Sequence, residues 1–341
     1  MIKPLLFLSA LACGAALAQG EAPVARANWA VARAGDSVYT FFGLGPGKTH
    51  ADIARDAYAL DLRSGQWRKA GDIPVAQGRL ASAALTVGGK VYLIGGYTVS
   101  PAGEEVSTPE VMRFLPDSGR FETETVMPVP VDDSVAMPWR DRWIVLVSGW
   151  HDKANMADVQ LYDTHTRQWL AATPYPGAPV FGHAGGLDGD SMVICDGVTA
   201  SKGADGKNTF AITNACWQGT LDPQHPARIS WRQLPAHPGI PLYRAGAVGY
   251  AGRIIFAGGS GRPYNYNGIG YDQLPAEPSS AVFSLNLQTQ AWQQHAPLPQ
   301  AGMDFRGLIP LDAGAYGLFG GMRAHQQVSG GIIRFQLADA L

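Results

Sequence analysis

Charged side chains that can transfer protons or bind anions recur in short segments along this 341-residue sequence. The segments AQGRLASA, PVDDSVA, VFGHAGG, PLYRAGA and GMDFRGL supply Arg79, Asp132, Asp133, His183, Tyr243, Arg244, Asp304 and Arg306. Carboxyl and imidazole groups act as acids and bases, and arginine binds carboxylates through paired hydrogen bonds. The candidates for proton transfer are His183, Asp133 and Asp304, and the candidate substrate contacts are Arg79, Arg244, Arg306 and Tyr243.

Each of these residues also has a structural interpretation. An arginine or histidine in a connecting segment can bond neighbouring loop carbonyls and do nothing else. A whole ring of such groups is harder to explain by structure alone, because clustered ionisable residues are typical of functional sites. Both interpretations stay open for any single residue.

A second candidate surface is the segment SGRPYNYNGIGYDQLPAEPSS, residues 260–280. Tyr264, Tyr266 and Tyr271 offer flat faces for a sugar ring, and neighbouring Asn and Arg side chains offer hydrogen bonds. We include Tyr264 and Tyr266 among the candidate substrate contacts. The alternative is that the tyrosines hold a glycine-rich loop against the rest of the protein.

An internal repeat predicts the elements that position these segments. A β-branched or aromatic run ending in a small residue and glycine recurs as SVYTFFG, KVYLIGG, RWIVLVSG, SMVICDG, RIIFAGG and AYGLFGG. The last glycines of these runs, residues 43, 96, 149, 197, 259 and 321, are 53, 53, 48, 62 and 62 residues apart. An aromatic residue follows with the same period, at Trp67, Phe121, Trp169, Trp231 and Trp292. Two independent markers with one period indicate six copies of one unit.

Each copy reads as short strands separated by turns, as in YALDLRSGQW and FSLNLQTQAW. The pattern predicts an all-β fold of radially arranged four-stranded sheets, a six-bladed β-propeller, because so many short strands would overfill one sandwich. The last copy ends before its fourth strand, and an uncovered strand edge invites aggregation. We predict that the N-terminal segment, residues 19–28, closes the last blade.

Long loops are expected on one face of this fold. In a four-stranded antiparallel blade, the loops between the second and third strands emerge beside the connections between blades. The longest of them span residues 97–109, 198–214 and 260–280. Long loops on a rigid scaffold commonly carry function, so we expect the site at this face.

Residues 1–18, MIKPLLFLSALACGAALA, place a lysine before an apolar stretch that ends in Ala-Leu-Ala. This pattern predicts a cleaved signal peptide, followed by a single propeller domain at residues 19–341. A lipoprotein signal at Cys13 is the alternative. No segment has the roughly 18 apolar residues that a membrane span needs, so we predict a periplasmic or secreted protein.

Two cysteines remain after such a cleavage, Cys195 and Cys216. In an oxidising compartment they predict a disulfide, with buried free thiols or half of a metal site as alternatives. The histidines show no metal-ligand spacing, so we expect no metal and no cofactor. The formal net charge of −2 disfavours nucleic acid as a partner.

The order of strand, glycine pair, strand, turn and tryptophan resembles the Kelch repeat over nearly the whole chain after residue 18. Among exported bacterial Kelch proteins, the chain is most similar to the N-acetylneuraminate epimerase group, which interconverts sialic acid anomers. The shared features are the export signal, six repeats, Arg79, His183 and the IIFAGG run before a Tyr- and Asn-rich loop. The resemblance implies a periplasmic six-bladed Kelch-type propeller with carbohydrate mutarotase (isomerase) activity.

One position departs from that group. Its proposed catalytic glutamate follows an Asn-Gly pair, where this chain has Asp196, Gly197 and Val198. Valine cannot transfer a proton, so anomer exchange would have to use Asp133 or Asp304 with His183. The copper radical galactose oxidases are a poor match, because their copper site needs a tyrosine cross-linked to a cysteine, and both mature cysteines are assigned to a disulfide.

We therefore expect an exported Kelch propeller that acts on a small carbohydrate by anomerisation of an acidic sugar such as N-acetylneuraminate. The alternative is a non-catalytic propeller that binds a glycan or a protein partner through the same face. Anomerisation needs a proton donor at the ring oxygen and a base at the anomeric hydroxyl.

Overall fold

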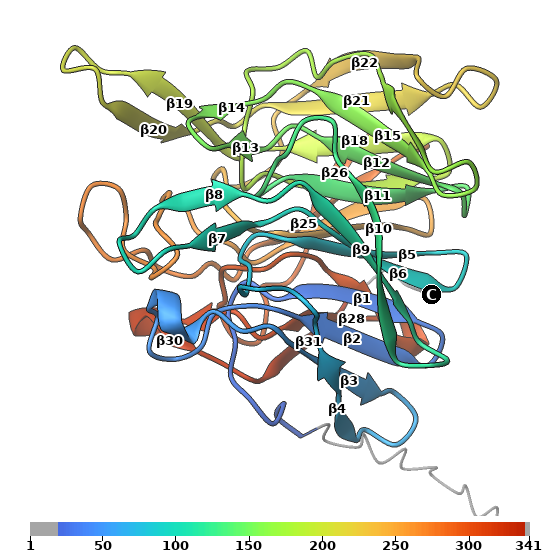
Figure 1. The fold of residues 1–341 in the computed structure, drawn as a ribbon. Helices are drawn as coiled ribbons and strands as arrows, with labels where there is room; N and C mark the ends of the chain where they lie inside the picture. Colours follow the sequence, from blue (N-terminus) through green and yellow to red (C-terminus); the bar gives the residue numbers. More distant parts are fainter. Residues whose placement is uncertain (1–19, 338–341) are drawn as a thin grey trace, which may run out of the picture.

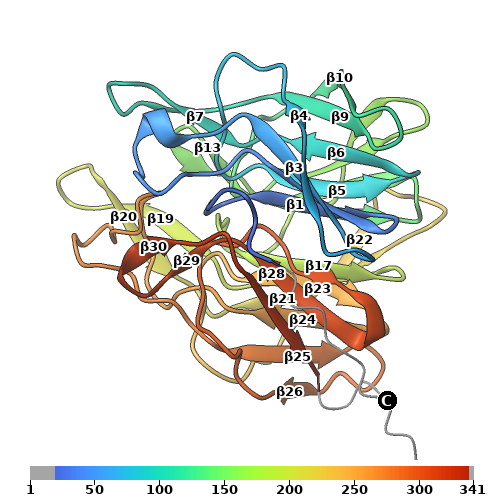
Figure 2. The same cartoon turned by 90° about the horizontal axis from the view of Figure 1, so that it is seen from below.

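The computed structural model describes residues 20–337 and contains six antiparallel sheets arranged around a central axis. Figure 1 and Figure 2 show the sheets lying one beside another, seen from two sides. The predicted six-bladed, all-β architecture is therefore confirmed. The predicted signal peptide at residues 1–18 and the lipoprotein alternative at Cys13 lie outside the described residues.

The blades are numbered here in chain order. Blade 1 contains β1 (Ala30–Ala34), β2 (Ser37–Phe41), β3 (Asp56–Asp61) and β4 (Trp67–Asp72). Blade 2 contains β5 (Ala83–Val87), β6 (Lys90–Ile94), β9 (Glu110–Leu115) and β10 (Arg120–Val126). Blade 3 contains β11 (Val135–Trp139), β12 (Trp143–Val147), β15 (Val159–Asp163) and β16 (Gln168–Ala171).

The second half of the chain repeats this order. Blade 4 contains β17 (Ala184–Asp188), β18 (Ser191–Cys195), β21 (Cys216–Leu221) and β22 (Ile229–Leu234). Blade 5 contains β23 (Gly246–Tyr250), β24 (Arg253–Ala257), β25 (Val282–Asn286) and β26 (Trp292–Gln294). Blade 6 contains β27 (Ile309–Pro310), β28 (Ala315–Phe319) and β31 (Ile332–Gln336).

Small hairpins are inserted into four of the blades. They are formed by β7 (Tyr97–Val99) with β8 (Glu105–Ser107), β13 (Trp150–His151) with β14 (Ala154–Asn155), β19 (Val198–Lys202) with β20 (Asn208–Ile212), and β29 (Met322–Arg323) with β30 (Gln327–Val328). Three short 3-10 helices complete the elements, η1 (His50–Asp52), η2 (Asp312–Gly314) and η3 (Ala324–Gln326).

The second strand of each blade explains the repeated apolar runs. These strands lie inside their sheets with neighbours on both sides; β12, for example, is buried at all five positions, WIVLV. A strand buried on both faces reads as a continuous apolar run. The glycines that follow are required by close contact: a Cβ on Gly96, which has φ +88°, would lie 2.6 Å from the Leu80 carbonyl oxygen.

The repeated aromatic residues pack between neighbouring blades. Trp67 of blade 1 makes an edge contact with Phe319 of blade 6, with ring centroids 6.4 Å apart. The indole of Trp169 in blade 3 donates a hydrogen bond to Thr125 Oγ1 of blade 2. Large apolar rings at these positions therefore hold adjacent sheets together.

The closure of blade 6 differs from the prediction. Its sheet has three strands within the described residues, and the N-terminal segment adds no fourth strand to it. Instead, the backbone N–H groups of Ala22 and Arg26 donate to the carbonyls of Gly330 and Ser329, just before β31. The segment reaches the predicted blade, where the Arg26 carbonyl also accepts from the Gly321 N–H. It then continues toward the axis at Asn28, whose N–H donates to the Asp304 carbonyl.

The predicted disulfide is present in blade 4. Cys195 ends β18 and Cys216 begins β21, and the two are directly paired across the sheet with Cα atoms 4.1 Å apart. The bond therefore links two strands at the point where the β19 and β20 hairpin leaves the blade.

The inserted hairpins and the blade connections lie on the same end of the propeller, as expected. Isolated bridges join each blade connection to the residue that follows the second strand; the pairs are Ala27 with Leu44, Leu80 with Tyr97, Asp132 with Trp150, Phe181 with Val198, Tyr243 with Ser260, and Met303 with Met322. Figure 1 shows the hairpins projecting from one side of the molecule. We call this end the loop face.

Candidate functional site

A ring of six equivalent backbone positions surrounds the axis beneath the loop face. All six adopt left-handed φ values, between +50° and +67°; they are Asn28, Ala81, Asp133, Gly182, Arg244 and Asp304. Successive backbone groups bond around the ring, as where Gly182 N–H donates to Asp133 and Arg244 N–H donates to Gly182, each at 2.8 Å. The ring closes where the Ala81 N–H donates to Oδ1 of Asn28. Non-glycine residues with positive φ are uncommon, and they concentrate at structurally determined sites.

Four of these six side chains are polar, and they meet on the axis. Arg244 forms ion pairs with Asp133 at 2.5 Å and with Asp304 at 3.0 Å, and Arg306 pairs with Asp133 from blade 6. Asn28 Nδ2 donates to Asp304 Oδ1 at 2.8 Å. The four charged side chains are between 0% and 5% exposed. We call these five residues the axial cluster.

Two tyrosines enclose the guanidinium of Arg244. The ring centroid of Tyr243 lies 4.9 Å from it and that of Tyr264 lies 5.5 Å from it. The Tyr243 hydroxyl also donates to Asp133 at 3.2 Å. Stacked aromatic faces and paired carboxylates satisfy this buried cation.

Electrostatics in the axial cluster favour the ionised pair of Asp133 and Arg244. Burial alone would raise the pKa of Asp133, but Arg244 and Arg306 bring it below its ordinary value. Burial raises the pKa of Asp304, although Arg244 and Asn28 oppose the rise. The Asp133 carboxylate is therefore an anchor for two arginines and is poorly suited to accept a proton.

A pocket of about 120 Å³ lies on the loop-face side of the axial cluster. Its wall is aromatic and acidic, with Tyr97, Glu105, Asp132, Asp133, Trp150, Asp152, Phe181, Phe210, Arg244, Asn265, Tyr266 and Tyr271. Phe210 of the β19 and β20 hairpin stacks on Tyr271 of the 260–280 loop, with centroids 4.0 Å apart. Loops of four blades, 2 to 5, thus build one pocket.

Two carboxyl groups of this loop-face pocket have shifted pKa values. Burial raises the pKa of Asp132 well above its ordinary value, and nearby Asp133 and Glu105 add to the shift, although the Ser107 hydroxyl donates to its carboxyl at 2.5 Å. Desolvation also raises the pKa of Glu105, which lies at the rim and is exposed. The pocket therefore pairs a buried carboxylic acid with a carboxylate nearer to solvent.

A second cavity of about 270 Å³ lies on the opposite side of the axial cluster. It follows the inner strands of all six blades, and its lining includes His183, Arg306 and Ser134 next to the cluster. His183 Nε2 bonds the Val147 carbonyl at 3.0 Å. We call this cavity the axial channel; the axial cluster separates it from the loop-face pocket.

The structure distributes the residues predicted from the sequence among four places. Asp133, Asp304, Arg244, Tyr243 and Tyr264 form or enclose the axial cluster, and Tyr266 lines the loop-face pocket. His183 lines the axial channel, and Arg306 belongs both to the axial cluster and to the channel wall. Arg79 bonds Glu110 and the Gly95 carbonyl, so it takes the structural role left open for it. These residues therefore do not meet at one mouth of the propeller.

Sequence reasoning missed most of the loop-face pocket. Glu105, Trp150, Asp152 and Phe210 were not proposed as site residues, although all four lie in the inserted hairpins. Asp132 was noted beside Asp133, but only its neighbour was assigned a role. The only feature of the sequence that pointed to this pocket was the length of the loops, which indicates a region and does not identify single residues.

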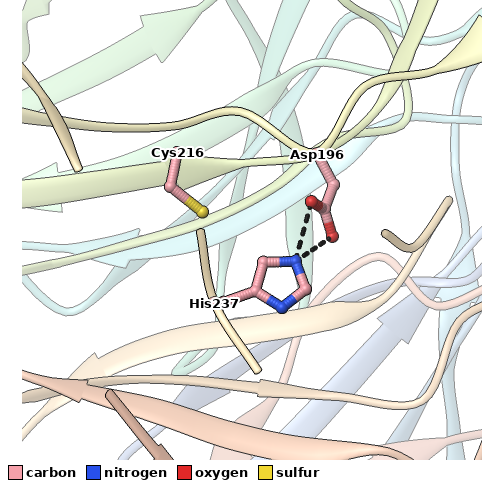
Figure 3. A group of neighbouring side chains, drawn as sticks. All are labelled: Asp196, Cys216 and His237. Carbon is pink, nitrogen blue, oxygen red and sulfur yellow. Dashed lines mark hydrogen bonds and ion pairs between the residues drawn. The ribbon is translucent and has the colours of Figure 1, made fainter. Parts of the chain in front are cut away.

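Asp196, Cys216 and His237 are close enough together to hold a metal ion, with ligand atoms within 4.8 Å of one another (Figure 3). Cys216 is bonded to Cys195, so its sulfur is not a free thiolate ligand. His237 bonds both Asp196 oxygens, at 2.9 and 3.1 Å, and Asp196 raises the pKa of His237 against the lowering effect of burial. With the disulfide formed, Asp196 and His237 are a buried ion pair and the group is not a metal site.

Comparisons with known proteins agree with this architecture. A protein of Gallus gallus, "Kelch-like protein 15", is 28% identical over 111 residues, which cover 33% of this chain and 22% of that protein. A solved structure described as "Structure of YjhT" aligns over 94% of this chain and 97% of that chain, with a TM-score of 0.75 and 18% sequence identity. This chain is a six-bladed Kelch-type propeller.

The remaining comparisons limit what can be concluded beyond the fold. No family model matches the chain. Within residues 20–337, no helix has the length and apolar character needed to cross a membrane. The match to the Gallus gallus protein spans less than a quarter of that protein's length, and the solved structure is only 18% identical. These similarities therefore show the fold alone.

Proposed function

We propose that the loop-face pocket binds a sugar and exchanges its anomers. The observation that carries the proposal is the juxtaposition of Asp132 and Glu105 with shifted pKa values in one aromatic pocket. Ring opening needs an acid at the ring oxygen and a base at the anomeric hydroxyl. Asp132 acts as the acid, because burial preserves its proton, and Glu105 acts as the base.

The aromatic side chains of the pocket support a sugar as ligand. Trp150, Tyr266 and Tyr271 line it and are only partly buried, so part of each side chain is accessible to a sugar ring. Asn265 and Asp152 offer polar contacts beside them. A pocket in which polar groups converge beside aromatic side chains is a typical site for a small ligand.

Charge determines which sugar fits best. The pocket's only arginine among the described residues, Arg244, is already paired with Asp133 and Asp304. A neutral pyranose therefore meets less repulsion from the acidic wall than N-acetylneuraminate does. The acidic sugar stays in the test because the resemblance to the epimerase group points to it.

The same proposal includes export to the periplasm or to the medium. The disulfide between Cys195 and Cys216 supports it, because disulfides persist in oxidising compartments. Fractionation of cells that express the full chain, with the disulfide state read by thiol labelling, tests this part.

The activity is tested by NMR on freshly dissolved single anomers of galactose and N-acetylneuraminate. The wild-type protein should accelerate the approach to anomeric equilibrium for galactose, and Asp132→Asn and Glu105→Gln should each lower the rate at least tenfold. Glu104→Gln, at an exposed neighbour outside the pocket, is the matched control and should retain the rate. Absence of acceleration for both sugars would contradict the enzymatic proposal. Saturable sugar binding without acceleration would favour the alternative, a non-catalytic propeller that binds a glycan.

A further inference from the structure

The disulfide of blade 4 lies against two further side chains with metal-binding atoms. An oxygen of Asp196, a ring nitrogen of His237 and the sulfur of Cys216 are all within 4.8 Å of one another (Figure 3). The sulfur of Cys195 is bonded to that of Cys216, so it belongs to the same group. All four residues are between 0% and 6% exposed. Two sulfurs, an imidazole and a carboxyl group therefore meet at one buried point.

The backbone explains how Cys195 and Asp196, neighbours in the sequence, reach the same point. Successive side chains of a strand point to opposite faces of the sheet. Asp196 follows the last residue of β18 and has a left-handed φ of +62°, so the alternation ends there. Its carboxyl group therefore lies beside Cys216, the residue paired with Cys195 across the sheet. His237 reaches the group from the connection between β22 and β23.

The hydrogen bonds of His237 match those of a metal-binding histidine. Its Nδ1 lies 3.0 Å from the Pro238 carbonyl, which can only accept, so Nδ1 carries a hydrogen. Histidines that bind metals usually donate this second N–H to a carbonyl or a carboxylate. Nε2 faces both oxygens of Asp196, at 2.9 and 3.1 Å, and one hydrogen lies between the two groups. A metal ion bound to Nε2 and the carboxylate takes the place of that hydrogen.

Neighbouring groups hold both of these side chains in position. The Leu242 N–H donates to Asp196 Oδ2 at 2.8 Å. The His237 ring stacks on Phe283, with ring centroids 4.2 Å apart. Contacts of this kind orient metal ligands and strengthen metal binding.

The types of ligand in this group favour zinc. Thiolates, imidazole and carboxylate all bind Zn²⁺, and structural zinc sites have four ligands in a tetrahedron. Ca²⁺ and Mg²⁺ prefer sites made of oxygen atoms alone. Ligand atoms of one tetrahedral zinc lie about 3.3–3.8 Å apart, so the four side chains must move closer together. An open disulfide frees both sulfurs to rotate into such an arrangement.

We propose that the dithiol form of this chain binds one zinc ion through Cys195, Cys216, His237 and Asp196, and that the disulfide form does not. Because these ligands are buried, zinc enters while the reduced chain folds. Binding releases the two thiol protons and the hydrogen shared by His237 and Asp196. An organic disulfide reverses it by thiol–disulfide exchange: the bond between Cys195 and Cys216 forms, the reagent leaves as two thiolates, and Zn²⁺ is released.

The test refolds the full chain from urea with Zn²⁺, either with a phosphine reductant or with an organic disulfide. Cys13→Ala is used as the background, so that Cys195 and Cys216 are the only cysteines. After gel filtration the reduced chain should retain about one zinc per chain, and the oxidised chain less than about a tenth of that amount. Co²⁺ in place of zinc should give a thiolate charge-transfer band in the reduced chain only.

His237→Ala and Asp196→Asn should each lower the zinc affinity of the reduced chain at least about tenfold, measured by competition with a chromophoric chelator. His225→Ala and Asp222→Asn are the matched controls, because they change an exposed His and Asp pair, and they should bind zinc like the background chain. Circular dichroism checks the folding of each chain, and two ligand variants are used so that a folding failure in one leaves the other decisive.

Three results would each overturn the proposal. They are no retention of zinc by the reduced chain, equal retention by the reduced and oxidised chains, and unchanged affinity in both ligand variants. The last result would show that zinc binds the thiols without the buried pair of Asp196 and His237.

Discussion

Arg306 and Asp133 belong to opposite blades, 6 and 3, and their side chains form an ion pair on the propeller axis. The contact joins residues 173 positions apart in the sequence. Arg244 of blade 5 pairs with the same carboxylate. One buried carboxylate thus links three blades, and its removal or that of its partners should affect the whole fold.

Loss of Arg244 should strongly destabilise the protein. Arg244→Ala leaves Asp133 and Asp304 buried without this cation, and breaking a buried ion pair costs about 3–5 kcal/mol. We expect the free energy of unfolding in urea to fall by this amount. Arg262→Ala is the matched control, because Arg262 pairs with Asp272 at the surface, where such pairs are worth at most about 1 kcal/mol. Equal losses in the two variants would contradict a special role for the axial cluster.

His183 should make stability depend on pH. Its pKa is lowered from 6.5 to about 4, so the unfolded chain binds more protons than the folded chain between these values. The contribution to stability is fully present above pH 6.5 and is lost as the pH falls toward 4. It amounts to about 3 kcal/mol over this range.

Urea unfolding at pH 7.5 and at pH 4.5 tests this dependence on His183. The loss of stability between the two pH values should be smaller in His183→Leu than in the wild type. His225→Leu, at a histidine on the exposed β21–β22 turn, should behave like the wild type. Identical pH profiles for His183→Leu and the wild type would show that His183 does not titrate as described.

Removal of the disulfide should lower stability without changing the fold. The bond closes a loop with a sequence separation of 21 residues, for which the chain-entropy relation gives about 3 kcal/mol. Urea unfolding of the Cys195→Ala, Cys216→Ala double variant, with far-UV circular dichroism, measures this. A double variant as stable as the oxidised wild type would show that the bond contributes nothing.

The stacked pair of Phe210 and Tyr271 should support ligand binding at the loop face. The pair connects the β19 and β20 hairpin to the 260–280 loop, and such aromatic contacts contribute about 0.5–1.5 kcal/mol. Phe210→Ala should therefore weaken galactose binding by about twofold to tenfold and speed proteolysis of the hairpin. Tyr250→Ala, at an exposed tyrosine outside the pocket, is the control, and an equal effect there would refute the assignment.

Adjacent residues show where prediction from the sequence failed. Asp132 and Asp133 look equivalent in PVDDSVA and both line the loop-face pocket, yet their partners differ. Asp133 has a positive φ and forms ion pairs in the axial cluster, whereas Asp132 forms a backbone bridge with Trp150 and accepts a hydrogen bond from the Ser107 hydroxyl. Periodicity places the connection but not the partners of its side chains.

The sequence by itself determined the six blades, the central apolar strands, the glycine turns and the cysteine pair. These follow from repeated local patterns, since strand burial and backbone φ are encoded within each repeat. Only the tertiary structure decided that Asp133, Arg244 and Arg306 neutralise one another and divide the axis into two cavities. Such pairing depends on distances between blades far apart in the sequence, and no single repeat contains that information.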